Sequence, residues 1–229
     1  GDQNVAIGQN SLDSNTEGQK NVAIGFKALC TNTTADQVVA VGCGALISNT
    51  TGANNVAVGS LSLEGTTTGS DNTAAGPASG LSLTTGSNNL LLGHDAGRSN
   101  SPNTITTGSD RIVLGNNSIT NAYIRVDWTV TSDLRDKMNI EPISHGLDFV
   151  NQLNPIKFNF KKSRENATSH GRKKYGFKAQ DILALEGEDN VIIDNEDPNS
   201  LKYIGSHLVP VLVNAIKELK AEIELLKNK

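Results

Sequence analysis

The chain has 229 residues and a formal net charge of −4. A net acidic chain is a poor candidate for general nucleic-acid binding, because contacts with phosphate need an excess of lysine and arginine. Its apolar runs all fall short of the roughly 18 residues that a transmembrane helix needs, so no membrane insertion is expected.

The composition changes near residue 120. Residues 1–120 hold 17 of the 22 glycines but only 4 of the 20 Lys and Arg residues, and the other 16 basic residues follow. Two compositions on one chain predict separate domains. We expect a Gly-punctuated β-solenoid fibre segment over 1–121, a linking strand over 122–131 and a charged domain over 132–229.

The first segment is built from a 17-residue repeat. A short β-prone run ends in glycine at positions 8, 25, 42, 59, 76 and 93, and a last copy ends at 115. Such a period is typical of stacked solenoid coils, with glycine at a tight turn or a close backbone approach. A second apolar stretch and a polar turn follow each run, which predicts two short strands per coil around a narrow column of Val, Ile and Ala. So thin a core favours three chains around a common axis.

The Asn-Val-Ala-Ile-Gly units at Asn4–Gly8 and Asn21–Gly25 resemble the head repeats of trimeric autotransporter adhesins and of some phage tail-fibre shafts. The resemblance covers residues 4–115 and implies a trimeric β-roll or β-helix that binds a cell surface, with a receptor or glycan as partner. The carboxylates of the repeats are scattered rather than paired as a glycosidase requires, so a structural segment is predicted.

Neither a metal site nor a cofactor is predicted. Cys30 and Cys43 fit no zinc spacing and are expected to be small buried side chains. The four histidines lie far apart in the sequence and match no ligand spacing: His94, His145, His170 and His207.

Between the two domains the polarity alternates. Ile124, Val126, Trp128 and Val130 are apolar and their neighbours are polar, which predicts a half-buried strand. This strand leads directly into Thr131-Ser132-Asp133-Leu134-Arg135-Asp136-Lys137.

Ser132 and Lys137 are a candidate nucleophile and base. A lysine can take the serine proton if burial or a nearby cation, such as Arg135, lowers its pKa. Five residues place two side chains about 140° apart on a helix and on opposite faces of a strand, so the pair can meet only across a turn or between chains. From the spacing alone, the alternative is a surface loop in which Ser132 or Asp133 caps a helix.

The motifs that follow Lys137 make the assignment of Ser132 and Lys137 as a reacting pair more specific. In order they are Asn139-Ile140-Glu141-Pro142-Ile143, Leu153-Asn154-Pro155, Phe158-Asn159-Phe160, Tyr175–Gln180 and Ala215–Leu219. Together they resemble the intramolecular chaperone auto-processing domain of phage endosialidases, tail fibres and neck appendages, which also occurs in membrane-anchored eukaryotic transcription factors. The resemblance covers nearly all of residues 132–229. It implies that Ser132 is the nucleophile, that Lys137 is the general base and that trimerisation precedes a cut at Thr131–Ser132, while Asp133 and Arg135 are motif neighbours without an assigned role.

Within this domain the alternation from Ile156 to Phe160 predicts a strand. The polar residues 161–174 predict a long exposed arm with a basic tip, and a second strand or a helix is expected from Tyr175. A final helix of roughly 25 residues is predicted, with Pro210 in its first turn. Alternating Ile and Leu at its seam favour a two-stranded coiled coil on the simplest rule, whereas the three-fold fibre and the family resemblance imply a trimeric one. The seam consists of Val209, Leu212, Ile216, Leu219, Ile223 and Leu226.

The sequence therefore predicts a mainly β trimeric fibre followed by an α+β chaperone domain that ends in a coiled-coil helix. We expect a self-cleaving, homotrimeric phage tail fibre or tailspike, present in the virion and assembled in the host cytoplasm. No leader peptide is predicted, and the opening residues indicate a fragment of a longer protein. One alternative is a structural adhesin whose C-terminal domain trimerises without cutting. A transcription-factor relative is disfavoured, because nothing upstream resembles a DNA-binding domain.

Overall fold

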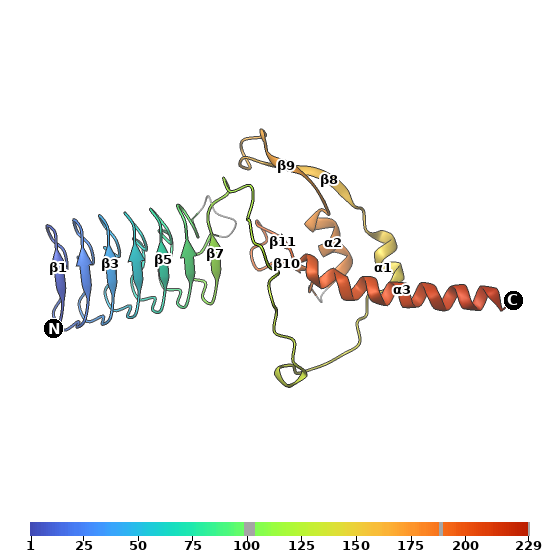
Figure 1. The fold of residues 1–229 in the computed structure, drawn as a ribbon, viewed down its shortest axis with the longest axis horizontal. Coiled ribbons are helices and arrows are strands. Elements are labelled where there is room, and N and C mark those ends of the chain that lie inside the picture. The colour runs from blue at the N-terminus through green and yellow to red at the C-terminus, as the bar shows by residue number, and fades with distance from the viewer. Residues whose placement is uncertain (99–103, 188–189, 229) are drawn as a thin grey trace. The chain divides into compact units, whose positions relative to one another are not determined.

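The computed structural model describes residues 1–98, 104–187 and 190–228. The chain forms two compact units, Gly1–Asn121 and Ala122–Lys229, which are described separately (Figure 1). In the described residues of the first unit, seven three-residue strands pair in parallel and in chain order. They are β1 (Val5–Ile7), β2 (Val22–Ile24), β3 (Val39–Val41), β4 (Val56–Val58), β5 (Thr73–Ala75), β6 (Leu90–Leu92) and β7 (Ile112–Leu114).

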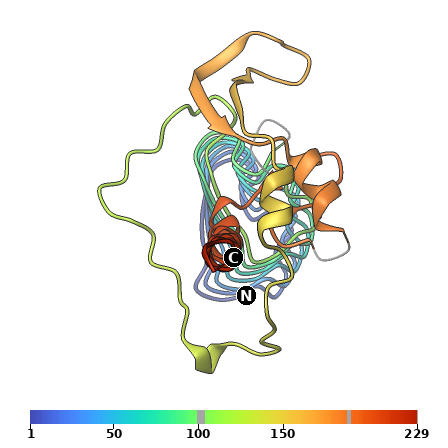
Figure 2. The same ribbon diagram turned by 90° about the vertical axis from the view of Figure 1, so that its right-hand side faces the viewer.

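The strands stack in the register that the repeat predicts. Ala23 pairs with Ala40, and Ala40 with Ala57, so that each strand lies 17 residues from the next. The last pair, Leu91 with Val113, spans the longer final interval. Figure 2 looks along the stack, and the coils of the first unit overlie one another. The predicted solenoid is confirmed.

The core of the solenoid includes two prominent columns of buried apolar side chains. The middle residue of each strand after β1 points inwards, and Leu29, Leu46 and Leu63 form the second column. The prediction of two strands per coil is wrong, because the second column lies in turns. Leu29 and Leu46 have φ angles of 53° and 50°, a left-handed conformation through which no strand can run. Their backbone N–H groups still bond to the next coil, for example from Leu29 to the Ala45 carbonyl at 2.9 Å.

The repeated glycine lies where the backbones of two coils approach each other closely. Gly42 has a φ of 137°, and a Cβ atom there would lie 2.4 Å from the carbonyl oxygen of Gly59 in the next coil. Both the conformation and the contact with neighbouring backbone exclude any other residue. The period seen in the sequence is therefore the repeat of this contact.

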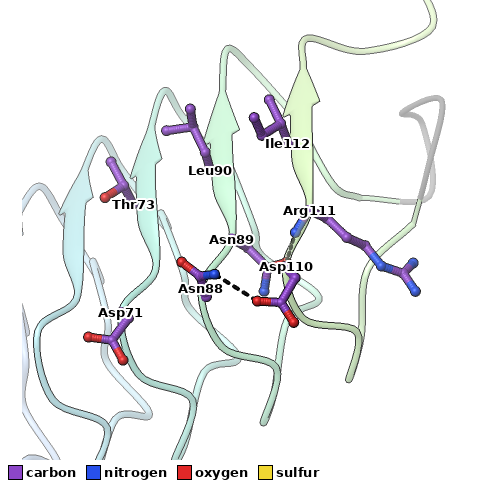
Figure 3. A pocket seen from close by; sticks show the side chains of 8 residues that line it. All are labelled: Asp71, Thr73, Asn88, Asn89, Leu90, Asp110, Arg111 and Ile112. Atoms are coloured by element: carbon purple, nitrogen blue, oxygen red, sulfur yellow. Dashed lines mark hydrogen bonds between the residues drawn. The ribbon is translucent and has the colours of Figure 1, made fainter. Parts of the chain in front are cut away.

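Buried asparagines connect successive coils. The side chain of Asn72 donates to the Gly86 carbonyl and to Asn55 Oδ1, and its own Oδ1 accepts from the backbone and side chain of Asn89. Figure 3 shows the end of this ladder, where Asn89 accepts from the backbone N–H of Arg111. The ladder satisfies backbone groups that the narrow coil would otherwise leave unpaired.

The branched residues beside each buried alanine point out of the coil. The first and third residues of every strand are half-buried or exposed, so the predicted column of Val, Ile and Ala holds the alanines but not the Val and Ile residues on either side of them. The coil is too narrow to hold more than one inward side chain from each strand. Cys43 is also exposed and Cys30 only half-buried, against expectation.

The linking strand predicted over 122–131 is not present. Residues 122–131 have no regular structure, and their apolar side chains are exposed, with Trp128 at 73%. A strand needs a neighbour for its backbone hydrogen bonds, and none of the described sheets supplies one to this segment.

The second unit is a small α+β domain. Its elements are a 3₁₀ turn η1 (Leu134–Asp136), α1 (Leu147–Gln152), β8 (Ile156–Lys161), β9 (Ser169–Gly176), α2 (Ala179–Glu186), β10 (Ile193–Asp194), β11 (Lys202–Tyr203) and α3 (Gly205–Lys227). The core is formed by Phe149, Ile182, Ile192, Ile193, Leu208 and Val211. Among the described residues no helix has the length and apolarity to cross a membrane, and no group of three or more His, Cys, Asp or Glu could hold a metal ion.

The predicted arm is a two-stranded hairpin of β8 and β9, with a tip shorter than expected. The second strand begins at Ser169, not at Tyr175, because backbone pairing with β8 needs no apolar side chain. Lysine side chains lie over aromatic rings of the opposite strand, with Lys174 over Phe160 and Lys157 over Tyr175. These cation–π contacts join the two strands of the hairpin through their side chains.

The predicted terminal helix is confirmed as α3, which has 23 residues. It begins five residues before Pro210, so the placement of that proline in the first turn is wrong. A single missing N–H group near the end of a long helix removes one hydrogen bond and does not end it.

Candidate functional site

The candidate site is the short turn that follows Thr131 and Ser132. Asp133 and Lys137 are extended, with φ and ψ of −67° and 137° and of −113° and 144°, and η1 lies between them. The turn is closed by backbone N–H groups of Asp136 and Lys137, which donate to the carbonyls of Asp133 and Leu134, both at 3.2 Å. A reversal between two extended residues brings the chain back toward Ser132.

This reversal places Lys137 Nζ 2.7 Å from Ser132 Oγ, to which it donates a hydrogen bond. Two residues five apart would face away from each other on a helix or a strand. The structure brings the two together across a turn within one chain, which is one of the two arrangements that the spacing allows.

The carboxylate of Asp133 binds Arg135 in two ways. It accepts from the backbone N–H of Arg135 at 2.9 Å, and from the guanidinium through Nε at 3.0 Å and an Nη atom at 2.5 Å. The guanidinium bond and the backbone bond both lower the pKa of the Asp133 carboxyl below its ordinary value. The same pairing raises the pKa of Arg135.

The site is open to solvent. Thr131, Ser132 and Lys137 are exposed, and η1 contains no buried residue. A lysine acts as a base only in its neutral form, which removal of water favours. The single chain thus provides a hydroxyl in contact with an amine, in a setting that is open to water.

The structure does not bring the histidines together. His94 lies next to the carboxylate of Asp95, and His207 contacts the Val191 carbonyl. The His145 ring stacks on that of Phe149, with 4.4 Å between the ring centroids. His170 lies on β9. Within the described residues they form no common site.

A groove of about 340 Å³ on the first unit is lined by side chains of the outer sheet face and of the preceding turn. Figure 3 shows Thr73, Leu90 and Ile112 along one side, with Asn88 donating to Asp110 at 2.7 Å on the other. Asn88 lies between the carboxylates of Asp71 and Asp110 along the stack. Asp110 is thus paired with an amide along the stack and not with a second carboxylate.

Sequence reasoning missed a polar clamp between α1 and α3. Glu218 accepts from the backbone N–H of Leu147, and Asn214 donates to the His145 carbonyl at 3.0 Å. The clamp ties the segment after η1 to the terminal helix. Since its partners lie about 70 residues apart, no local pattern reveals it.

Comparison with protein families gives one match. Residues 132–192 match the family Peptidase S74, described as the chaperone of endosialidase. The match begins at Ser132 and covers about a quarter of the chain, so the resemblance seen in the sequence is confirmed there, while residues 193–229 lie outside it. It supports a chaperone role for this part of the protein. A search of the curated proteins and of the solved structures found no match.

Proposed function

We propose that residues 132–229 are an intramolecular chaperone that assembles the repeat segment as a homotrimer and then releases it by cutting the chain at Thr131–Ser132. The observation that carries the proposal is a coincidence at one residue. The chaperone match begins at Ser132, and the hydroxyl of Ser132 is the group that Lys137 contacts at 2.7 Å.

The cut proceeds through an ester. Ser132 Oγ attacks the carbonyl carbon of Thr131 while neutral Lys137 takes the hydroxyl proton. The peptide bond between the two residues breaks, the proton passes to the leaving amine, and the acyl group of Thr131 is left on Ser132 Oγ. Water hydrolyses this ester, which frees the Thr131 carboxylate and restores the hydroxyl of Ser132 as the new N-terminal residue.

Assembly supplies what the exposed turn lacks. Partner chains that cover the turn would remove water from Lys137 and favour its neutral form. A cut that requires this cover occurs only after the chains have assembled. Cleavage thereby reports that the fibre has formed.

The terminal helix supports assembly through a second apolar face. Leu208, Val211 and Ala215 of α3 are buried within the domain. A separate row at heptad spacing remains exposed or half-exposed, including Ile216 at 66%. These residues are Val209, Leu212, Ile216, Leu219, Ile223 and Leu226. Ile and Leu at alternating seam positions suit two strands on the simplest rule, and the three-fold fibre favours three.

The solenoid offers a matching surface. Parallel sheets are normally covered on both faces, yet the outer face of β1–β7 carries exposed and half-buried side chains that are Val, Ile or Leu in every strand except β5. Two further copies of the chain would cover these side chains and add the core that each narrow coil lacks. A prealigned trimer helps such long-range parallel pairing most, because loop closure opposes it early in folding.

We place the protein in a phage tail fibre or tailspike, where the repeat segment attaches the virion to a host receptor or glycan. The regular outer surface of the solenoid supports a fibre. The second candidate is an adhesin whose C-terminal domain trimerises without cutting, and the openness of the Ser132 turn in the single chain favours it.

One experiment separates the two. The chain is expressed, its trimeric state is confirmed, and the intact masses are measured after a denaturing gel. Cleavage predicts pieces of 131 and 98 residues. Ser132→Ala and Lys137→Ala should each leave one full-length band, whereas the control Ser144→Ala, at an exposed serine further along the chain, should still be cut. A wild-type trimer that stays whole would contradict self-cleavage. The non-cleaving adhesin would then be the remaining candidate.

A further inference from the structure

The turn that joins Ser132 to Lys137 has little to hold it. It is three residues long, contains no buried side chain, and Leu134 at its start is exposed. A single turn of 3₁₀ helix fixes several backbone dihedrals in return for few hydrogen bonds, so it does not persist without added support. The contact at 2.7 Å therefore depends on other groups.

Asp133 provides that support from within the turn. Its carboxylate accepts the backbone N–H of Arg135, which fixes the first peptide groups of η1. The same carboxylate holds the guanidinium of Arg135 through both oxygens, a geometry that a planar fork matches and a lysine does not. The carboxylate of Asp133 thus restrains both the backbone and the side chain of Arg135.

We propose that Asp133 is a positioning residue for the cut, and that with Arg135 it keeps the turn closed so that Lys137 stays against Ser132. This inference rests on the proposed function. Neither residue is assigned any contact with the reacting atoms, and both act through the place of Lys137. The two bonds of Asp133 can be separated, because asparagine keeps the backbone cap while it weakens the charged fork.

The test is the rate at which purified trimer cuts itself, measured by intact mass. We expect Asp133→Ala to cut on the order of 10- to 100-fold more slowly than wild type, because a misplacement of about 1 Å lowers rates to this extent. Asp133→Asn should restore part of the rate. Arg135→Ala should slow the cut, and Asp133→Ala combined with Arg135→Ala should be no slower than Asp133→Ala alone, because the two residues act as one unit.

Two readouts distinguish positioning from other roles. The pH midpoint of the cleavage rate should be the same in Asp133→Ala and wild type, and the trimer and its melting temperature should be unchanged. A moved midpoint would instead mean that the pair sets the proton affinity of the base. A lost trimer would mean a general structural role. Either result overturns the inference, as does an Asp133→Ala variant that cuts at the wild-type rate.

A measurement that needs no cleavage keeps the two proposals apart. In the uncut Ser132→Ala protein, hydrogen exchange over residues 132–138 is followed by mass spectrometry with and without Asp133→Ala. We expect faster exchange in this segment alone, because the backbone bonds of η1 open. Unchanged exchange would overturn the inference even if the wild-type chain were never cut, whereas a wild-type chain that is not cut overturns the proposed function.

Discussion

Glu218 of α3 accepts a hydrogen bond of 2.6 Å from the backbone N–H of Leu147, which lies 71 residues earlier in the chain. The bond satisfies a free N–H at the start of α1, and the negative charge suits the N-terminal end of that helix. Through it, the helix that we propose to trimerise is linked to the segment that begins at the proposed cut. Gly146 makes the contact possible, because a Cβ there would lie 2.2 Å from the Glu218 carboxylate.

We expect Glu218→Ala to lower the free energy of unfolding of the second unit by about 1 kcal/mol, the usual value of a lost cap. Gly146→Ala should cause a similar loss by displacing the same carboxylate, and the two changes together should not add. Thermal unfolding followed by circular dichroism checks this. Glu222→Ala, at an exposed position one turn further along α3, is the control. Equal effects of Glu218→Ala and Glu222→Ala would contradict the clamp.

Removal of one buried asparagine should weaken the solenoid much more. Asn72→Ala leaves the Gly86 carbonyl and the backbone N–H of Asn89 without their partner in a buried site. Each such group costs about 1–3 kcal/mol. The midpoint of chemical unfolding of the first unit should therefore fall by an amount equivalent to about 2–6 kcal/mol.

The control for this change is Asn88→Gly. Asn88 is the exposed neighbour in the sequence and has a φ of 56°, which glycine adopts without strain. It should alter the unfolding midpoint little. If both variants unfolded at the same denaturant concentration, the ladder would not contribute to stability.

The glycine column should tolerate no side chain. Gly59 has a φ of 137°, and a Cβ there would meet the Gly76 backbone at 2.6 Å, where no flexible side chain can move away. Gly59→Ala should therefore leave the repeat segment insoluble or unfolded. Gly44→Ala is the matched control, because Ala78 already occupies the equivalent place two coils later at a φ of 54°. Soluble yield and circular dichroism compare them, and equal folding of the two variants would contradict the close approach.

These glycines explain why the sequence predicted the solenoid so well. Close backbone approach permits only glycine at Gly42 and Gly59. The interval between these glycines in the sequence therefore equals the length of one coil. No residue type indicates the left-handed backbone at Leu46, since leucine is also common in strands. For this reason the prediction of a second strand in each coil was wrong. The number of strands depends on local conformation, which residue type alone does not determine.

For the candidate site, the sequence predicted the residues and the limits on their geometry. The five-residue spacing of Ser132 and Lys137 required a turn or a second chain, and the turn of η1 meets that requirement. The contacts of Asp133 with Arg135 were not predicted, because a carboxylate next to a serine caps many turns without further consequence. The contact of Glu218 with Leu147 was not predictable either, since it depends on the packing of distant elements.

The carboxyl of Asp133 should titrate below its ordinary pKa of 3.8, because Arg135 stabilises its charged form. Its support of the turn is therefore complete above about pH 4 and is lost as the pH falls through the lowered pKa. Carbon-13 NMR of the aspartate carboxyls in Ser132→Ala protein would give the midpoint. Arg135→Ala should raise that midpoint toward the ordinary value, and an equal midpoint in both proteins would rule out the pairing.

The fluorescence of Trp128 can be used to follow the burial of residues 122–130, the segment before Thr131. This residue is the single tryptophan of the chain and is 73% exposed in one copy, within an apolar alternation that lacks a strand partner. If copies of the chain pair through this segment, Trp128 becomes buried on assembly, and its fluorescence maximum moves to a shorter wavelength. We expect this shift in trimeric Ser132→Ala protein.

Two further variants test whether the shift depends on assembly. Adding Ile216→Glu, which charges the exposed face of α3, should leave the chain monomeric and the emission at long wavelength. Adding Lys217→Glu, at an exposed neighbouring position, should preserve both the trimer and the shift. A confirmed trimer that emits like the monomer would mean that residues 122–130 stay unpaired, and that the alternation in this segment has no structural role.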